Sequence, residues 1–360
     1  MRTAPIQNLG DYEIQEEIAS GGMARVFRAV KTGVGGFRSE VAVKVLHDNL
    51  AALKEYRQMF KEEARIGALL RHKNLLYVQE YGEVQGIAYI VTEFFRSVSL
   101  EDLVKKTRKV PISEALYILS EAAEGLHALH EAADPDKDKK LGLVHRDISP
   151  HNVLLGDDGR VKIIDFGIAK RSDPTEKTRP GVVKGKARYM SPEQAGAGKV
   201  DLRSDIYSLG LVFLRLISGG KPHGNGNTVE IMVRARVGVD PEKLLKRAKA
   251  PKKVKELARK MLAADPWERL ETALDVAKEA RKLLSEINAT FDAHDFTAWV
   301  GDATAKKKRT PKKTAAPPRG GTIRAPVPAG PGIHPKWLFM GLGALFAVAL
   351  LAHLLNQLFW

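Results

Sequence analysis

The 360-residue sequence contains no cysteine. This absence excludes disulfide scaffolds, thiolate zinc sites and cysteine nucleophiles, and it agrees with a reducing compartment. The first residues, Met1–Asp11, lack the apolar stretch of a secretory signal. No repeat of fixed period runs along the chain, so repeat architectures are not expected.

Acidic residues are outnumbered, with 43 Asp and Glu against 58 Lys and Arg and a net charge of +15. Residues 301–336 hold nine of the basic residues but only one acid, Asp302. Because the excess charge is concentrated in that segment, a nucleic-acid-binding face on a folded domain is not predicted. The composition, 44% hydrophobic and 28% charged, is typical of a globular chain.

The pattern of apolar residues predicts an α+β protein with two lobes, a β-rich one at about 12–95 and a helical one at about 96–285. The predicted strands are 13–18, 24–30, 40–46, 88–93 and 161–164. The predicted helices are 56–70, 100–107, 113–131, 204–218, 229–237, 254–263 and 270–285, and Ser113 is expected to cap the third of these.

The last part of the chain has a different character. Residues 286–300 carry three aromatic side chains and are expected to pack on the second lobe. Residues 301–336, with seven prolines, predict an extended linker. Residues 337–358 form an apolar run long enough to span a membrane, flanked by tryptophans. The basic residues before it predict a single-pass protein of the cell membrane with its folded part in the cytoplasm and no sensor domain beyond the span.

Two local motifs in the first lobe indicate phosphate binding. A glycine-bearing turn, Ile18–Val26, lies between two predicted strands, and such turns let backbone N–H groups approach phosphate oxygens. Lys44 follows at the end of Val41-Ala42-Val43, and Glu63 lies on the next helix. Glu62 and Glu63 point about 100° apart on a helix, so only one of them can face Lys44.

The second lobe carries the most informative motif, His145-Arg146-Asp147 with Asn152, followed by Asp165-Phe166-Gly167. Asp147 can accept a hydroxyl proton, and Asn152 and Asp165 supply the oxygen ligands that Mg²⁺ prefers. Further along come Ser191-Pro192-Glu193, Asp205 and Arg269.

With these motifs in this order, the chain resembles the bacterial eukaryotic-like (Hanks-type) serine/threonine protein kinases over about residues 12–285. The resemblance implies a two-lobed kinase fold that uses ATP and Mg²⁺. It implies that Lys44 holds phosphates, Glu63 holds Lys44, Asp205 braces the catalytic loop, and Arg269 pairs with Glu193. It also implies that His145 and Phe166 pack together in the regulatory spine. The implied nucleotide-binding residues are Ile18, Ala19, Ser20, Gly21, Gly22, Met23, Ala24, Arg25, Val26, Ala42, Lys44, Glu93, Phe95, Leu154 and Asp165, with Thr92 at the gatekeeper position.

The sequence departs from this family at two positions near the expected phosphate. Ser149 stands where such kinases usually have Lys, and Lys186 stands where they usually have Thr. We interpret the pair as an exchange in which the Lys186 ammonium replaces the missing charge; Lys186 pointing to solvent is the alternative. Alanines at positions 19 and 24 replace two family glycines and add one Cβ each.

The predicted activity is phosphorylation of protein hydroxyls, including the chain's own Thr175 or Thr178 in trans, in membrane-associated signalling. Ser172 is a further candidate site, but it is expected to stay unmodified. Two alternatives stay open: a pseudokinase that binds nucleotide without turnover, and a small-molecule phosphotransferase. Protein substrates and a second copy of the chain are the expected partners, with dimer formation left open.

Overall fold

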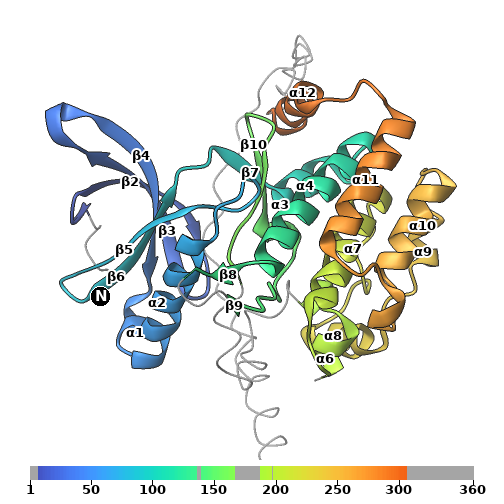
Figure 1. Cartoon of the computed structure of the whole chain (residues 1–360), viewed down its shortest axis with the longest axis horizontal. Helices are drawn as coiled ribbons and strands as arrows, with labels where there is room; N and C mark the ends of the chain where they lie inside the picture. The colour runs from blue at the N-terminus through green and yellow to red at the C-terminus, as the bar shows by residue number, and fades with distance from the viewer. Residues whose placement is uncertain (1–6, 136–138, 167–186, 197, 306–360) are drawn as a thin grey trace, which may run out of the picture. The chain divides into compact units, whose positions relative to one another are not determined.

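The computed structural model describes residues 7–135, 139–166, 187–196 and 198–305. The first lobe is built on a six-stranded antiparallel sheet of order β1-β2-β3-β4-β6-β5 (Figure 1). Its elements are β1 (Asn8–Leu9), β2 (Tyr12–Ser20), β3 (Ala24–Thr32), η1 (Val34–Gly36), β4 (Arg38–Leu46), α1 (Asp48–Ala51), α2 (Lys54–Leu69), β5 (Val78–Val84) and β6 (Ile87–Glu93).

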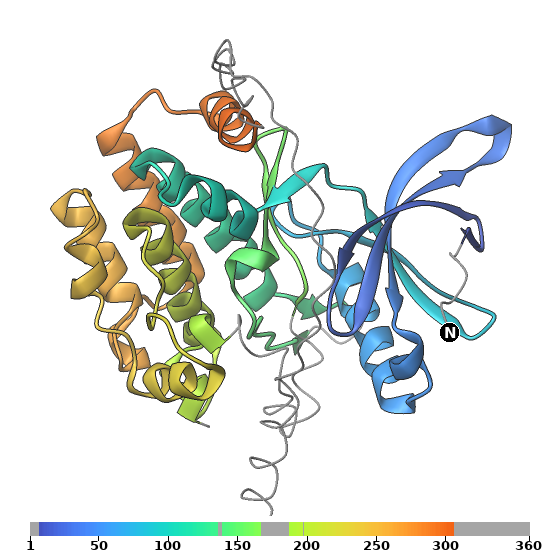
Figure 2. The same ribbon diagram turned by 180° about the vertical axis from the view of Figure 1, so that it is seen from behind.

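The sheet buries both of its faces near the middle. Val41, Val43 and Val45 of β4 pack in one apolar cluster with β2, β3 and β6. On the other side, Tyr56 and Phe60 of α2 pack in a second cluster that includes strand residues. Figure 2 shows α2 lying against the sheet. One carboxylate of this helix, Glu63, therefore reaches Lys44 of β4.

The second lobe is mostly helical and also contains two short sheets, one of three strands and one of two. Its elements are β7 (Ser97–Ser99), α3 (Leu100–Thr107), α4 (Ile112–His130), β8 (Ala133–Asp134), β9 (Lys139–Lys140), η2 (Pro150–Asn152), β10 (Val153–Gly156), β11 (Val161–Ile163), η5 (Ala187–Tyr189), α6 (Pro192–Gly196), α7 (Leu202–Ser218), α8 (Thr228–Val237), α9 (Glu242–Leu245), α10 (Lys252–Met261), η6 (Pro266–Glu268), α11 (Ala273–Ile287) and α12 (Ala293–Thr304).

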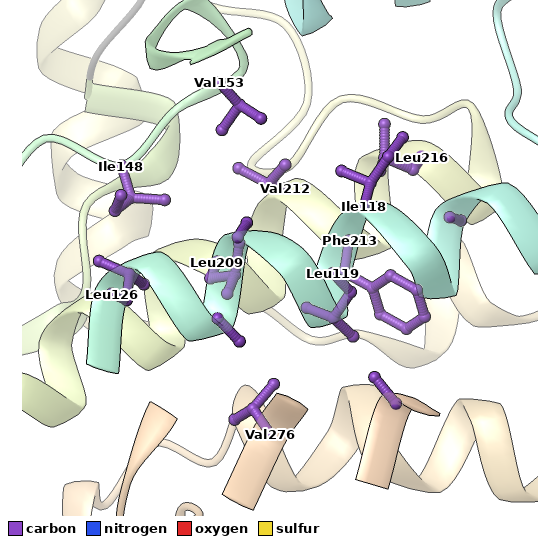
Figure 3. Packing of buried hydrophobic residues seen from close by; sticks show 14 of the residues in the cluster. Ile118, Leu119, Leu126, Ile148, Val153, Leu209, Val212, Phe213, Leu216 and Val276 are labelled. Carbon is purple, nitrogen blue, oxygen red and sulfur yellow. The ribbon is translucent and has the colours of Figure 1, made fainter. Parts of the chain in front are cut away.

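The core of this lobe is centred on α4, which is apolar along most of its length. Leu119 and Leu126 of α4 are buried in one cluster with Leu209 and Phe213 of α7 and Val276 of α11 (Figure 3). Ile148 and Val153 of the catalytic-loop region join the same cluster (Figure 3). The loop that carries Asp147 is therefore anchored on the most rigid part of the lobe.

A glycine brings α4 close to the segment between the two lobes. A Cβ on Gly125 would lie 2.8 Å from the Asn74 backbone oxygen, closer than packed atoms allow. Asn74 itself donates to the Val161 carbonyl at 2.8 Å, and the Ile163 N–H donates to the Asn74 carbonyl at 2.8 Å. This close approach fixes β11 beside α4.

The two-lobed α+β organisation predicted from the sequence is confirmed, and the predicted helix 100–107 has the observed bounds. The prediction that Ser113 caps a helix is wrong, because α4 begins at Ile112 after Pro111 and places Ser113 inside its first turn. The aromatic stretch expected to pack on the second lobe does so: Phe296 of α12 is fully buried in its core.

Among the residues that the structure describes, no helix combines the length and apolar character needed to cross a membrane. The segments predicted as linker and span lie outside the described residues, apart from the first five residues of the linker. The domain boundaries assigned to these segments stay predictions.

Candidate active site

Lys44 lies between two carboxylates from different elements. Its Nζ is 2.6 Å from Glu63 Oε1 on α2 and 2.8 Å from Asp165 Oδ1, which follows β11. Burial opposes the charged form of Lys44, but the charges and hydrogen bonds of Asp165 and Glu63 outweigh it and raise its pKa above the ordinary value. Glu62 is bonded to Arg65 at 2.8 Å instead, so Glu63 is the helix carboxylate that faces Lys44.

The catalytic-loop residues form a second bonded group. Asn152 Nδ2 donates to Asp147 Oδ2 at 3.1 Å and to the Asp147 carbonyl at 2.8 Å, and both residues are buried. The Ile164 N–H donates to the Asn152 carbonyl at 3.0 Å. That bond ties the loop to the residue preceding Asp165, so Lys44, Asp147, Asn152 and Asp165 are gathered in one region.

Two of these positions have unusual backbone angles. Arg146 has φ +61° and Asp165 has φ +57°, in the left-handed region that non-glycine residues rarely adopt. Asp205 stabilises the first of them, because its carboxylate accepts from the N–H groups of His145 at 2.7 Å and Arg146 at 2.8 Å. The strain at the loop is thus held by a fully buried carboxylate.

The side chains of His145 and Phe166 pack edge to face, with ring centroids 6.3 Å apart and planes at 77°. His145 Nε2 also lies 3.1 Å from the Ile164 carbonyl. These contacts hold the segment before Gly167 against the catalytic loop.

The residues predicted to line the adenine site lie on neighbouring strands and on the connection between the lobes. Val26 pairs with Lys44 across β3 and β4, and Ala42 pairs with Thr92 across β4 and β6. Glu93 ends β6, and Leu154 lies on β10 opposite Ser99. The Glu93 carboxylate accepts from Lys162 Nζ at 2.8 Å. The Glu93 N–H donates to the Tyr77 carbonyl at 3.1 Å, and the Glu93 carbonyl accepts from Thr92 Oγ1 at 3.2 Å. Phe95 is nine-tenths buried beneath the Lys162 ammonium and the Arg160 guanidinium.

The glycine turn joins β2 to β3 and is mostly exposed. The Gly21 N–H donates to the Ala24 carbonyl at 2.9 Å. Ala24 is buried in the core of the first lobe, so its extra methyl group points away from the turn's exposed face. The remaining predicted turn residues are exposed or partly exposed: Ile18, Ala19, Ser20, Gly21, Gly22, Met23 and Arg25.

Two histidines that the sequence did not single out support this site. His47, directly after β4, lies with Nε2 2.8 Å from the Gly21 carbonyl and so holds the turn. His130, at the end of α4, lies with Nε2 2.9 Å from Asp205 Oδ2. Neither contact has a local sequence signal, because the partners are 26 and 75 residues away.

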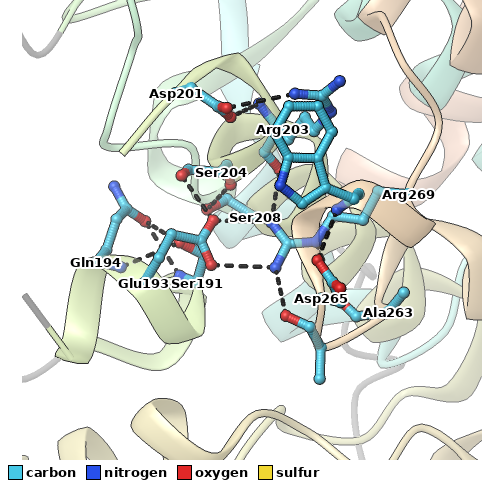
Figure 4. Close-up of polar contacts among 12 residues, drawn as sticks. Ser191, Glu193, Gln194, Asp201, Arg203, Ser204, Ser208, Ala263, Asp265 and Arg269 are labelled. Atoms are coloured by element: carbon cyan, nitrogen blue, oxygen red, sulfur yellow. Dashed lines mark hydrogen bonds and ion pairs between the residues drawn. The ribbon is translucent and has the colours of Figure 1, made fainter. Parts of the chain in front are cut away.

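A buried ion pair joins Glu193 of α6 to Arg269. Arg269 donates to both Glu193 oxygens at 2.8 and 3.0 Å, and Ser204 Oγ donates to Glu193 at 2.6 Å (Figure 4). Burial raises the pKa of Glu193, but the bonds from Arg269 and Ser204 outweigh it and hold the pKa below its ordinary value. The pairing of Arg269 with Glu193 expected from the sequence is present.

Asn152 and Asp165 fit the requirements of a Mg²⁺ site. Asn152 uses only its amide N–H₂ on Asp147, which leaves its oxygen as a ligand, and the Asp165 side chain is half exposed. No cluster of three or more metal-binding side chains occurs in the described part of the chain, so phosphate and water would complete the coordination.

Of the two positions that depart from the family pattern, Ser149 and Lys186, the structure describes only Ser149. Ser149 is 1% exposed, and its hydroxyl has no hydrogen-bond partner among the described residues. Lys186 lies outside the described residues, as do Gly167, Ser172, Thr175 and Thr178. The proposed exchange of Lys between positions 149 and 186 therefore stays a hypothesis.

Residues 12–282 match the family model described as the protein kinase domain. Among curated proteins, the chain is 36% identical over 286 residues to the tyrosine-protein kinase MasK of Myxococcus xanthus, covering 78% of this chain and 44% of MasK. It is 32% identical over 326 residues to the serine/threonine-protein kinase PknA of Mycobacterium tuberculosis, covering 89% and 67%. It is 32% identical over 284 residues to the serine/threonine-protein kinase PrkC of Bacillus subtilis, covering 79% and 41%.

The chain thus spans less than half the length of MasK and PrkC. Among solved structures, the kinase domain of PknI from Mycobacterium tuberculosis is similar at a TM-score of 0.56 and 24% identity, over 78% of this chain and 99% of that domain. At that identity, the likeness concerns the fold.

Proposed function

Since this chain belongs to the protein kinase family, we propose that it transfers the γ-phosphoryl group of ATP to serine and threonine hydroxyls of proteins. The observation that carries the proposal is the joined arrangement of Lys44–Glu63–Asp165 with Asp147–Asn152. This arrangement combines a cation for phosphate, oxygen ligands for metal and a carboxylate for a hydroxyl.

Asp147 is the base of the proposed mechanism. Its carboxylate orients the substrate hydroxyl and accepts the proton as the oxygen–phosphorus bond forms. The bond from Asn152 fixes one carboxylate oxygen, and the braced backbone of residues 145 and 146 sets its direction. The leaving group is ADP, whose phosphates Lys44 contacts while Glu63 holds the ammonium in place.

Mg²⁺ held by Asn152 and Asp165 would neutralise the charge that develops on the phosphate oxygens. Lys44 has a raised pKa and keeps its positive charge throughout. The site therefore supplies preorganised positive charge, and the chemistry depends mainly on position.

Ser149 and Lys186 bear on which hydroxyl is phosphorylated. MasK is named a tyrosine kinase, whereas PknA and PrkC are named serine/threonine kinases. The predominance of serine/threonine names among the relatives supports the same class here. Phosphoamino-acid analysis of a labelled protein substrate separates the two classes, and label on tyrosine alone would contradict the proposal.

We retain the exchange of charge between positions 149 and 186 as part of the proposal. Removing Lys186 as Lys186→Ala should lower turnover about 100-fold, as the loss of one transition-state donor does. Adding Ser149→Lys to that variant should restore part of the loss. Unchanged turnover in the single variant, or absence of rescue in the double variant, would contradict the exchange.

A pseudokinase is the second candidate, and the unusual Ser149 with its alanine-substituted glycine turn favours it. Against a pseudokinase, the chain keeps all four residues that turnover needs: Lys44, Asp147, Asn152 and Asp165. Nucleotide binding alone would not require Asp147. A small-molecule phosphotransferase is less well supported, because Glu193 of the Ser191-Pro192-Glu193 motif pairs with Arg269 as the resemblance to protein kinases implies.

Incubation of the full-length chain with γ-labelled ATP, Mg²⁺ and a protein substrate tests these functions. Label on protein that disappears in Asp147→Asn supports the protein kinase. Tight ATP binding without label on protein selects the pseudokinase. Consumption of ATP with label only on an added small hydroxyl compound selects the small-molecule phosphotransferase.

We further propose that residues 337–358 anchor the chain in the cell membrane and that neighbouring copies phosphorylate one another in trans. The apolar run Leu338–Ala352 and the basic residues before it support this placement. Anchoring raises the local concentration of neighbours and so favours transfer between chains. Membrane fractionation of the full chain and of residues 1–305 tests the anchor. Recovery of both in the soluble fraction would contradict it.

A further inference from the structure

Three arginines from three elements surround one loop of the second lobe, residues 219–225. Arg188 of η5 donates to the Gly224 carbonyl, and Arg215 of α7 donates to the Gly219 carbonyl. Arg234 of α8 donates to the carbonyls of His223 at 2.6 Å and Asn225 at 2.7 Å. Three guanidinium groups therefore lie together where η5, α7 and α8 meet. We call Arg188, Arg215, Arg234 and the loop between them the seam.

The positive charge of this seam is poorly balanced. Arg234 forms an ion pair with Glu230 at 3.3 Å, and both side chains are about half exposed. Within the described ranges, neither Arg188 nor Arg215 has a carboxylate within ion-pair distance. Glu101 lies near Tyr189 in the same region, but its ion pair is with Lys105 at 3.7 Å. Among the described residues, the seam therefore keeps a net positive charge.

His223 shows that this charge is felt inside the loop. The residue is 8% exposed, and its Nε2 has no partner among the described residues. Burial, together with the charges of Arg188 and Arg234, lowers the pKa of His223 to about 4. His223 is therefore neutral and does not balance the positive charges of Arg188 and Arg234.

The seam lies beside the catalytic loop. Gln194 Nε2 donates to the Arg146 carbonyl at 3.2 Å, and Gln194 Oε1 accepts from the Ser191 N–H at 3.0 Å. These bonds tie Ser191, three residues after Arg188, through Gln194 to the residue before Asp147. A polypeptide whose hydroxyl reaches Asp147 must continue over the neighbouring surface, where the Arg188 side chain is partly exposed.

We infer, on the basis of the proposed function, that the substrates of this kinase carry an anionic side chain close to the phosphorylated hydroxyl. Arg188 is the main specificity-determining residue, with Arg234 and Arg215 adding to the field. The anionic group is a carboxylate of Asp or Glu, or the phosphate of a residue phosphorylated earlier; both have the same chemistry for a guanidinium. Complementary charge of this kind selects partners more than it raises the overall affinity.

The test uses the full-length chain and peptides with one serine, differing at a single flanking position. That position carries Asp, phosphoserine, Asn or Lys, and it is moved through four places on either side of the serine. One exposed ion pair predicts about a fivefold higher kcat/KM for Asp than for Asn at the preferred place. The phosphoserine arm distinguishes the two sources of charge, and a larger ratio there indicates substrates phosphorylated earlier.

The variants Arg188→Gln and Arg188→Glu test the residue itself. The Asp-to-Asn ratio should fall to about 1 in Arg188→Gln, and in Arg188→Glu the Lys peptide should become the better substrate. The control Arg259→Gln removes an arginine of α10 that is paired with Glu242, and the ratio should not change. A ratio that stays at about five in both Arg188 variants would overturn the assignment.

Assays of the four peptides with the unsubstituted chain test the inference even where a variant does not fold. Equal kcat/KM for all four peptides would contradict the anionic preference. Fluorescence anisotropy with labelled peptides measures the same preference without turnover. Selective binding of acidic peptides without phosphate transfer would therefore contradict only the proposed function. Equal binding with transfer would contradict only the anionic preference.

Discussion

At the scale of single residues, Lys44 depends on the carboxylates that surround it. Two anions compensate its burial, and each comes from a different lobe. Removing one of them changes the position of the ammonium more than its charge, because the other remains. Losing one of these carboxylates should therefore affect catalysis, which depends on the position of the ammonium, more than stability.

We predict that Glu63→Gln lowers kcat/KM for ATP-dependent transfer by 10-fold or more, because Lys44 is then held by Asp165 alone. Steady-state kinetics with a protein substrate measures the change. The matched control is Glu62→Gln, one residue away on α2 and paired with Arg65, which should stay within about twofold of the original chain. Equal effects of the two substitutions would contradict the assigned role of Glu63.

His223 gives a prediction on stability and pH. The folded chain keeps this histidine neutral down to about pH 4, whereas the unfolded chain protonates it below about 6.5. The unfolded state therefore binds more protons, and stability is lost as the pH falls from 6.5 to 4. The loss attributable to His223 is ~3 kcal/mol at most.

The variant His223→Asn should remove this part of the pH dependence, because Asn does not titrate and tolerates the positive φ of +58°. Urea denaturation at pH 7.5 and pH 4.5 gives the two free energies of unfolding. The exposed His294→Asn is the control and should keep the original pH dependence. A His223→Asn chain with the original pH dependence would contradict the buried neutral histidine.

At the scale of elements, α12 shows how an extension becomes part of a lobe. Phe296 is fully buried and its ring lies 4.7 Å from that of Tyr117 on α4, while Trp299 and Phe291 pack beside it. Asp292 caps the helix through a capping box with Asp295. The helix is therefore bound to the lobe by its aromatic face and begins at a defined residue.

We predict that Phe296→Ala lowers the free energy of unfolding by about 3–5 kcal/mol, the usual cost of removing a buried phenyl ring. The urea midpoint of the folded chain measures it. The same substitution at Phe37, which is 74% exposed in the connection between β3 and β4, should cost less than about 0.5 kcal/mol. A small effect at Phe296 would mean that α12 does not contribute to the core.

At the scale of the whole molecule, the candidate site draws its residues from both lobes. Lys44 and Glu63 belong to the first lobe, and Asp147, Asn152 and Asp165 to the second. A nucleotide that contacts both groups links the two lobes thermodynamically. Ligand binding should therefore stabilise the whole folded unit.

We predict that ATP with Mg²⁺, at 100 times its Kd, stabilises the chain by about 2.7 kcal/mol and raises Tm by a few degrees. Chelation of Mg²⁺ with EDTA should remove most of the shift. Asp165→Asn should also remove it, because this change deletes a metal ligand and a partner of Lys44. An undiminished shift in Asp165→Asn would contradict the proposed metal site.

Much of the fold was predictable because its elements carry local patterns. The strands predicted at 24–30 and 40–46 and the helices predicted at 100–107 and 204–218 follow from the periodicity of their apolar residues. In the structure, both strands and the second helix are two residues longer. The helix ends were less well predicted. Helix α11 begins after Thr272, whose capping box with Asp275 was overlooked, and α4 begins before Ser113.

By itself, the sequence determined which chemical groups the chain carries and their spacing, and these predict the catalytic residues because each motif is short and local. Only the tertiary structure decided that Glu63 and not Glu62 reaches Lys44, that His130 joins Asp205, and that arginines of three elements surround one loop. The physical reason is that these contacts join residues far apart in the chain, whose distances depend on how helices and strands pack.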